Sequence, residues 1–390
     1  MSNQTRSRGS LRLGAALLAT VALIAASCGD DDDDADDAPA EAAEESADDG
    51  ATDDGATDDG ATDDAATDDA ATDDAATDDG ATDDAATDDA AADAGFRVAI
   101  VAPSASNDLA FTQSIVDSIE RVAESRPIET SITDGTFIVE DAAAALRGYA
   151  EDGFDLVIAH GSQYGAPLQE IAPDFPDVSF AWGTAADTFG IPNVYAYTVR
   201  ADEGGYVNGT IAAQLTESNT LGVVGPIEVG DAKLYVDGFV AGVAAQNPDA
   251  TVNVNYIESF SDVALASEAA NAHVSNGADV LTGTAQMVVG ATGVAGEAGI
   301  PWFGTQSNQT DLGPGIVVAS QVYHWEVLFD EIIDNIQAGT LGGEVFIATL
   351  ANGGLEMEFN AGYGLDPDIQ SAAEDTVTAI ASGDLSTGIE

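Results

Sequence analysis

The chain has 390 residues with 70 Asp or Glu, nine Lys or Arg and one Cys, which gives a formal net charge of −61. This balance excludes nucleic acid and anionic membrane surfaces as charge-driven partners, because both are bound through clustered Lys and Arg. Residues 29–94 hold 29 acidic groups and no basic one, whereas 96–390 hold 41 acidic and six basic residues. The second segment is longer than a typical domain of about 100–200 residues, so we expect two lobes.

The N-terminus has the pattern of an export signal. Three arginines and no acid precede residues 13–27, an apolar run of 15 residues that is short for a membrane span. The run ends in small residues before Cys28, which resembles the bacterial lipobox, although the usual Leu is Ala25 here. We therefore expect residues 1–28 to be a lipoprotein signal with lipidation at Cys28. The alternative is an ordinary secretory signal with an incidental Cys.

Residues 29–94 have the composition of a solvated linker. They include eight consecutive Ala-Thr-Asp-Asp-(Gly or Ala) repeats from Ala51 to Ala90 and no aromatic residue. Such a segment has too little apolar surface to offset the entropy of ordering, so we expect a disordered acidic tether. Calcium binding is an alternative for paired carboxylates, but the repeat lacks the Gly-rich turn geometry and the bidentate Glu of known loops.

From Phe96 onward, short apolar runs alternate with segments that have helical spacing. The first series of predicted strands comprises 96–101, 128–132, 155–160, 178–182 and 194–198, and its predicted helices are 110–124, 141–150 and 166–171. The second series has strands 221–224, 252–257, 279–284 and 300–304 and helices 203–216, 232–245, 263–276 and 288–298. Two such series predict an α/β fold with two doubly wound lobes joined by a hinge.

Polar and aromatic residues follow the predicted strands of both series, as in Ser104–Asp108, His160–Tyr164, Ser259–Asp262, Thr284–Gln286 and Thr305–Asn308. Ligands of doubly wound sheets bind at these carboxyl ends, so a cleft between the lobes is the expected site. The three histidines form no His-x-x-x-His pair, and no Gly-x-Ser-x-Gly elbow occurs. We therefore expect no enzyme activity, no cofactor and no metal site.

Several segments of the body match a known family in order. They are Asp108–Gln113, Gly153–Ile158, Phe175–Ala181, Glu203–Gly209, Gly238–Val243, Asn247–Ala250, Ser259–Asp262 and Gly277–Val280. Together they resemble the basic-membrane-protein family of ABC-transporter substrate-binding lipoproteins, whose characterised members bind purine nucleosides. The match covers nearly all of 96–390.

The resemblance implies a class I periplasmic-binding-protein fold, in which the chain crosses between the lobes three times. Lobe one would comprise 96–201 plus 319–341, and lobe two 202–318 plus 342–390. Phe111 and Phe260 would stack on the two faces of the ligand, a task that suits aromatic rings. Ordinary core packing is the alternative for each ring.

Four departures from the family pattern bear on the ligand. The family Asn, Phe, Asp and Lys correspond here to Thr112, Ser162, Gln306 and Tyr323. An amide at the position of the ribose-binding Asp removes a charged clamp, because a carboxylate accepts two hydroxyl bonds where Gln has one acceptor oxygen. This loss weakens the nucleoside assignment, and the pattern is also consistent with a free purine base or another small heteroaromatic. The candidate ligand-binding residues are Asp108, Phe111, Thr112, Ser162, Phe260, Asp262, Thr284, Gln306 and Tyr323.

The expected function is that of an extracytoplasmic lipoprotein, a lipid-anchored monomer at the outer face of the cell membrane, that delivers a purine nucleoside or base to ABC permease subunits. The alternative is a ligand-sensing lipoprotein that signals to a membrane receptor. The acidic body is typical of proteins in high salt, but it is equally consistent with an acidic bias of the lineage.

Overall fold

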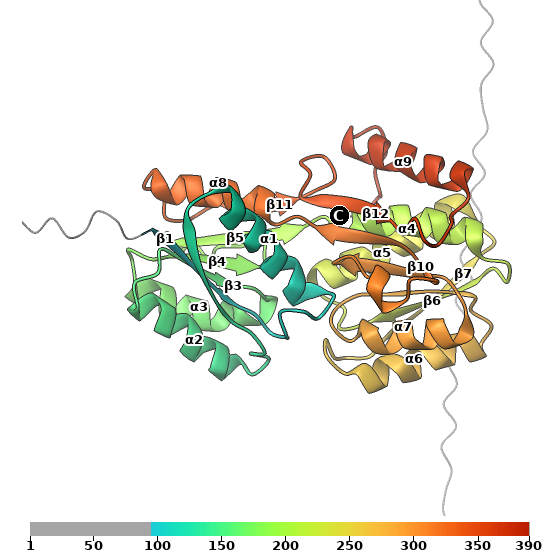
Figure 1. Ribbon diagram of the computed structural model, residues 1–390, viewed down its shortest axis with the longest axis horizontal. Coiled ribbons are helices and arrows are strands. Elements are labelled where there is room, and N and C mark those ends of the chain that lie inside the picture. Colours follow the sequence, from blue (N-terminus) through green and yellow to red (C-terminus); the bar gives the residue numbers. More distant parts are fainter. Residues whose placement is uncertain (1–94, 390) are drawn as a thin grey trace, which may run out of the picture. The chain divides into compact units, whose positions relative to one another are not determined.

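The computed structural model describes residues 95–389, which form two α/β lobes (Figure 1). The predicted signal peptide, Cys28 and the acidic linker lie outside the described residues. The first lobe is built on a six-stranded parallel sheet in the order β11-β5-β4-β3-β1-β2. Its strands are β1 (Phe96–Val101), β2 (Ile128–Thr133), β3 (Leu156–Ala159), β4 (Ser179–Gly183), β5 (Val194–Val199) and β11 (Val345–Ala348).

The second lobe has a six-stranded sheet in the order β12-β10-β9-β8-β6-β7, in which β12 is antiparallel to β10. Its strands are β6 (Thr220–Gly225), β7 (Thr251–Tyr256), β8 (Val280–Gly283), β9 (Trp302–Gln306), β10 (Val317–Tyr323) and β12 (Leu355–Phe359). The expectation of two doubly wound lobes is therefore confirmed.

Helices cover both faces of each sheet because the central strands are apolar on both sides. In β1, Val98 and Ile100 pack into one core with α1 (Phe111–Ser125) and α8 (Glu326–Gln337). Ala99 and Val101 alternate into the opposite core, where the helices are α2 (Val139–Glu151) and α3 (Gly165–Ile171). In the second lobe, α4 (Ala201–Leu215), α5 (Gly230–Gln246) and α9 (Pro367–Ala381) cover one face, and α6 (Val263–Ser275) and α7 (Val288–Ala298) cover the other.

The chain crosses between the lobes three times, from β5 to α4, from β10 to α8 and from β11 to β12. The positions of the last two crossings differ from the expected lobe boundaries at 319 and 341. Residues 319–323 belong to the second lobe, because β10 pairs there with β9 and β12. Residues 345–348 belong to the first lobe, because β11 pairs with β5.

Helices α4 and α5 approach each other closely through four glycines. A Cβ atom on Gly205 would overlap the Tyr235 carbonyl oxygen, and one on Gly242 would overlap the Tyr206 carbonyl oxygen. Gly209 and Gly238 make equivalent contacts with the facing backbone. These glycines lie in two of the segments that carry the family resemblance, so the resemblance there reflects helix packing.

None of the helices within residues 95–389 combines the length and the apolar character that a membrane span requires.

Candidate ligand-binding site

Strand ends from both lobes border one open cavity, whose empty space is about 440 Å³ when the open solvent at its mouth is counted. The segments at the carboxyl ends of β1, β2, β3 and β4 line it from the first lobe, and those of β6, β7, β8 and β9 from the second. The first lobe contributes Pro103, Phe111, Phe137, Ser162, Gln163 and Thr184. The second contributes Val229, Asp231, Phe260, Ala285, Gln286 and Gln306. The cavity therefore lies where ligands of doubly wound sheets bind.

Phe111, the first residue of α1, forms one aromatic wall. The residue is 7% exposed, and its ring stacks on the His160 ring, with centroids 3.9 Å apart and planes at 18°. His160 follows β3 and is fully buried. One face of Phe111 is thus occupied from within the protein, which leaves the other face for the cavity.

The imidazole of His160 is neutral. Burial lowers its pKa to about 3. Nε2 lies 3.1 Å from the Phe111 carbonyl oxygen, which can only accept, so Nε2 carries the proton. Nδ1 then accepts from the Tyr197 hydroxyl at 2.7 Å. Both ring nitrogens have protein partners, so His160 supports Phe111 instead of acting as an acid or base.

Two further aromatic rings line the cavity from loops. Phe260 follows β7 in the second lobe and is half-buried, and its carbonyl oxygen accepts from the Met287 backbone N–H at 3.1 Å. Phe137 follows β2 in the first lobe and is 37% exposed. The structure therefore brings Phe111 and Phe260 to one cavity from opposite lobes, and it adds Phe137, which the sequence reasoning did not select.

Three of the candidate polar residues begin helices instead of lining the cavity. Asp108 accepts hydrogen bonds from the Thr112 and Gln113 backbone N–H groups, at 3.1 and 3.0 Å, in the first turn of α1. The buried Thr112 hydroxyl lies 2.7 Å from the Ser104 hydroxyl. Asp262 is the N-cap of α6 and accepts from the Leu265 N–H at 2.9 Å. The two aspartates therefore cap backbone N–H groups at helix starts, whereas Thr112 ties α1 to the loop after β1.

The remaining candidates divide between the cavity and the layer behind it. Ser162 and Gln306 line the cavity. The Thr284 hydroxyl is buried without a hydrogen-bond partner within the described chain. Tyr323 is 1% exposed, and its hydroxyl donates to Asp231 Oδ2 at 3.4 Å. Tyr323 therefore reaches the cavity through Asp231.

Asp231 is a second cavity residue that the sequence reasoning did not select. It lies in the first turn of α5 and is 9% exposed, and burial raises its pKa to about 6, against the opposing effect of the Tyr323 hydroxyl. Its position in the sequence could have indicated it as a candidate, because Asp231 lies where the loop after the end of β6 leads directly into α5. Of the residues that line the cavity in the described chain, Asp231 is the one carboxylate, and none is Lys, Arg or His.

Backbone strain gathers at the same strand ends. Thr184, Ala285 and Gln306 line the cavity and have positive φ angles of 53°, 71° and 75°. Such conformations cost non-glycine residues about 1–3 kcal/mol and occur preferentially at functional sites. This observation supports the cavity as the ligand site independently of its shape.

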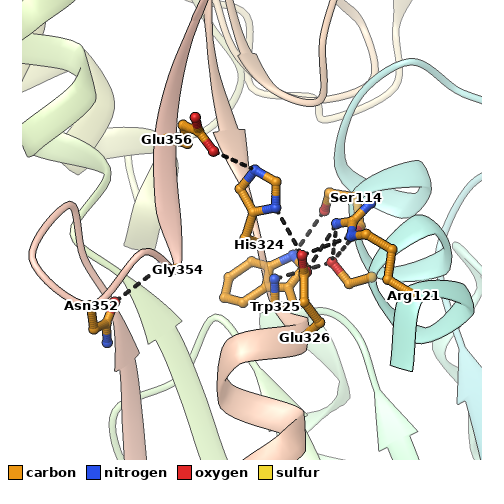
Figure 2. Close-up of polar contacts among 9 residues, drawn as sticks. Ser114, Arg121, His324, Trp325, Glu326, Asn352, Gly354 and Glu356 are labelled. Atoms are coloured by element: carbon orange, nitrogen blue, oxygen red, sulfur yellow. Dashed lines mark hydrogen bonds and ion pairs between the residues drawn. The ribbon is translucent and has the colours of Figure 1, made fainter. Parts of the chain in front are cut away.

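A polar cluster fixes the crossing from β10 to α8, as Figure 2 shows. Arg121 of α1 donates to Glu326 at 2.7 and 2.9 Å, and His324 Nδ1 contacts the same carboxylate at 2.8 Å. The indole N–H of Trp325 donates to the Ser114 hydroxyl at 2.9 Å. The Glu326 carboxylate keeps a pKa of about 2 despite burial, because His324 and Arg121 stabilise its charge.

A hydrogen bond also joins the lobes beside the cavity. The Ser307 hydroxyl, next to Gln306, donates to the Ala110 carbonyl oxygen at 2.7 Å. Ala110 directly precedes Phe111, so the strand end of β9 and the start of α1 are held together at the edge of the site.

Comparisons with known proteins agree with this geometry. A family model described as ABC transporter substrate-binding protein PnrA-like matches residues 96–381. A purine-binding protein of Brucella abortus is 27% identical over 258 residues, which cover 66% of this chain and 72% of that protein. The transcriptional activator protein Med of Bacillus subtilis is 25% identical over 263 residues, 67% of this chain and 81% of that protein.

A solved structure has the same fold. The solute-binding protein of an ABC transporter system from Conexibacter woesei superposes with a TM-score of 0.63 at 26% identity, covering 74% of this chain and 97% of that one. The matching family is one of substrate-binding proteins and not of enzymes. The chain therefore belongs to the PnrA-like family of ABC transporter substrate-binding proteins.

Proposed function

We propose that this protein captures a purine nucleoside or base between its two lobes and delivers it to an ABC permease. The observation that carries the proposal is the placement of Phe111 and Phe260 on opposite lobes of one cavity. A flat heteroaromatic ligand buries both of its faces when two such rings close on it. The purine-binding relative from Brucella abortus supports this class of ligand.

The proposal includes the location of the protein. Cys28 follows a short apolar run, and we propose that it carries the lipid that holds the protein at the outer face of the membrane. The body would act there as a monomer, with the acidic segment as its tether. A permease partner is general for solute-binding proteins of ABC importers, to which this family belongs.

The test is isothermal calorimetry of the full chain with inosine, adenosine, guanosine and their free bases. We expect Phe111→Ala and Phe260→Ala each to weaken binding about tenfold or more, because stacking contributes on the order of 1–3 kcal/mol per base. Phe189→Ala is the matched control. Phe189 is 41% exposed and stacks on Trp182 in the first lobe, and it does not line the cavity.

Melting temperatures of the ligand-free variants separate a binding role from a packing role. If both rings belong to the core, the melting temperature falls far enough to account for the lost affinity. Unchanged affinity in both variants, or no binding of any purine, would contradict the proposed function.

The similarity to Med favours ligand sensing as a second candidate function. The two candidates differ in one measurement, the uptake of radiolabelled purine by cells that lack the protein. Loss of uptake supports a transport receptor, whereas normal uptake with an altered transcriptional response supports a sensor.

A further inference from the structure

Asp231 has an unusual position for a carboxylate. It is 9% exposed, lines the cavity, and lies at the start of α5 beside Gln306 at the end of β9. Among the described residues, its one side-chain hydrogen bond within standard distance is from the Tyr323 hydroxyl, 3.4 Å from Oδ2, which is long, and the Gln306 side chain lies close enough to help lower its pKa. An ionised carboxylate accepts about four hydrogen bonds, so Asp231 retains capacity for donors that enter the cavity.

Two neighbouring side-chain amides, those of Gln306 and Gln286, also have an oxygen that can accept a hydrogen bond. Gln306 is 2% exposed, and its Oε1 is buried without a hydrogen-bond partner in the described chain. Oε1 of Gln286 is also buried without a partner, and both residues line the cavity. Buried acceptors without donors are costly, so a ligand that fits this wall must supply several donors.

The number of donors distinguishes classes of ligand. A free purine base offers a few N–H groups along the edge of a flat ring, whereas the sugar of a nucleoside adds hydroxyl groups on a second part of the molecule. Hydroxyl groups can pair with Asp231 while the base stacks on Phe111 and Phe260. A hydroxyl bond to a charged acceptor is stronger than one to a neutral acceptor.

The charge of the cavity excludes another class of ligand, the phosphate esters. Asp231 contributes a carboxylate, and no Lys, Arg or His lines the cavity in the described residues. A phosphate ester would bring a second negative charge into a partly desolvated space without a counter-charge, which is strongly unfavourable.

We propose that Asp231 selects the ligand of this cavity by binding its hydroxyl groups, so that a neutral nucleoside is preferred to the free base and to the phosphate ester. The inference rests on the proposed function and assigns its substrate class. It also restores a carboxylate to the site, from α5 instead of from the end of β9, where the chain has Gln306.

A purely structural role for Asp231 predicts a different result. An acid in the first turn of a helix stabilises that helix through its dipole. Loss of this effect would change the melting temperature, but it would weaken all ligands equally. Selectivity between matched ligands therefore separates the two roles.

The experiment is calorimetry of the full chain with inosine, 2′,3′-dideoxyinosine, hypoxanthine and inosine 5′-monophosphate. We expect inosine to bind at least about tenfold more tightly than dideoxyinosine and hypoxanthine, and the monophosphate not to bind. In Asp231→Asn, inosine should weaken about tenfold or more while dideoxyinosine changes less than about threefold. Asp237→Asn is the control, because Asp237 lies on the same helix, pairs with Lys233 at 2.8 Å and is outside the cavity.

Asp231→Glu is a second variant in case Asp231→Asn does not fold. It keeps the charge but displaces it by one methylene, so inosine should weaken and hypoxanthine should not. A preference for inosine that survives in both variants overturns the assignment of Asp231 and leaves the proposed function intact. Equal affinity of the wild-type protein for inosine and hypoxanthine also overturns the assignment of Asp231 and leaves the proposed function intact.

Failure of all four purine probes would instead reject the proposed function. D-Ribose and D-glucose then serve as hydroxyl-bearing probes without a base. Binding of either sugar that weakens in Asp231→Asn preserves the role of the carboxylate. Binding that Asp231→Asn leaves unchanged, or no binding of either sugar, overturns that role too.

Discussion

At the scale of single residues, Phe111 and Phe260 line the cavity and adjoin strand ends in opposite lobes. Asp108 and Asp262 adjoin the same ends, yet their carboxylates accept backbone N–H groups and begin helices. A short acidic side chain before a helix can either cap that helix or face a ligand, and only the three-dimensional arrangement distinguishes the two roles. Asp231 was missed for the same reason, because it reads as an ordinary first-turn acid.

The raised pKa of Asp231 makes a prediction for the ligand-free protein. Burial raises this pKa to about 6, from a usual value near 4. The protonated form is then favoured by folding, so the stabilising contribution is present below about pH 4 and is lost as the pH rises through about 6. Tyr323, the titratable group in contact with the carboxylate, has a pKa raised well above 10 and stays neutral.

The measurement is the melting temperature of Asp231→Asn minus that of the wild-type protein, between pH 4 and pH 7. We expect the difference to increase by a few degrees, because about two pKa units correspond to at most about 3 kcal/mol. Asp249→Asn, which removes an exposed carboxylate just after α5, is the control. A difference that does not vary with pH would contradict the burial of the charge.

At the scale of elements, the alternation of strands and helices up to β9 followed from periodicity, and the observed ends differ from the predicted ones by a few residues. The periodicity did not show which of the two sheets each strand joins. All seven residues of β10 are buried, and nothing local in Val317–Tyr323 tells which sheet it joins. Pairing with β9 and β12 decides this, and pairing is a long-range property. The short edge strand β11 was not predicted for the same reason, because its pairing with β5 is also a long-range contact.

The close contact of α4 and α5 gives a prediction about packing. Gly242→Ala should destabilise the fold by about 1–3 kcal/mol or more, because the new Cβ would overlap the Tyr206 carbonyl oxygen, which belongs to the backbone and cannot rotate away. Gly293→Ala is the matched control on α7, where no atom lies within 4 Å of the added Cβ. Alanine is favoured over glycine inside a helix, so this variant should gain up to about 1 kcal/mol.

Chemical denaturation measures both free energies of unfolding. Equal stability of the two variants would show that the helices can separate without cost, contrary to the observed backbone contact. A loss in Gly242→Ala with a gain in Gly293→Ala would locate the constraint at the α4–α5 interface.

At the scale of the whole molecule, the described residues begin at 95, where the composition changes from acidic repeats to apolar segments. The net charge of the body, with 41 acidic and six basic residues, is not explained by the ligand site. One acidic residue lines the cavity within the described chain, and the others are distributed over the two lobes.

Membrane attachment gives the prediction at this scale. Cys28→Ser should release the protein from the membrane fraction or leave the precursor uncleaved, because two acyl chains are needed for stable anchoring and no other Cys can carry them. Ser27→Ala, which keeps the thiol and a small residue before it, is the control. Fractionation followed by mass spectrometry of the N-terminus gives the result, and normal processing with membrane retention in Cys28→Ser would contradict lipidation.

The stack of Phe111 on His160 has a consequence for the entropy of binding. His160 is itself stacked on Tyr197, with centroids 6.0 Å apart, so three roughly parallel rings run from the cavity into the core. The Phe111 rotamer is therefore fixed before a ligand arrives, and this wall loses little conformational freedom on binding. Phe137 and Phe260 are less buried loop residues, so most of the ordering cost falls on them. Substitutions that stiffen these two loops should then improve affinity without any new contact to the ligand.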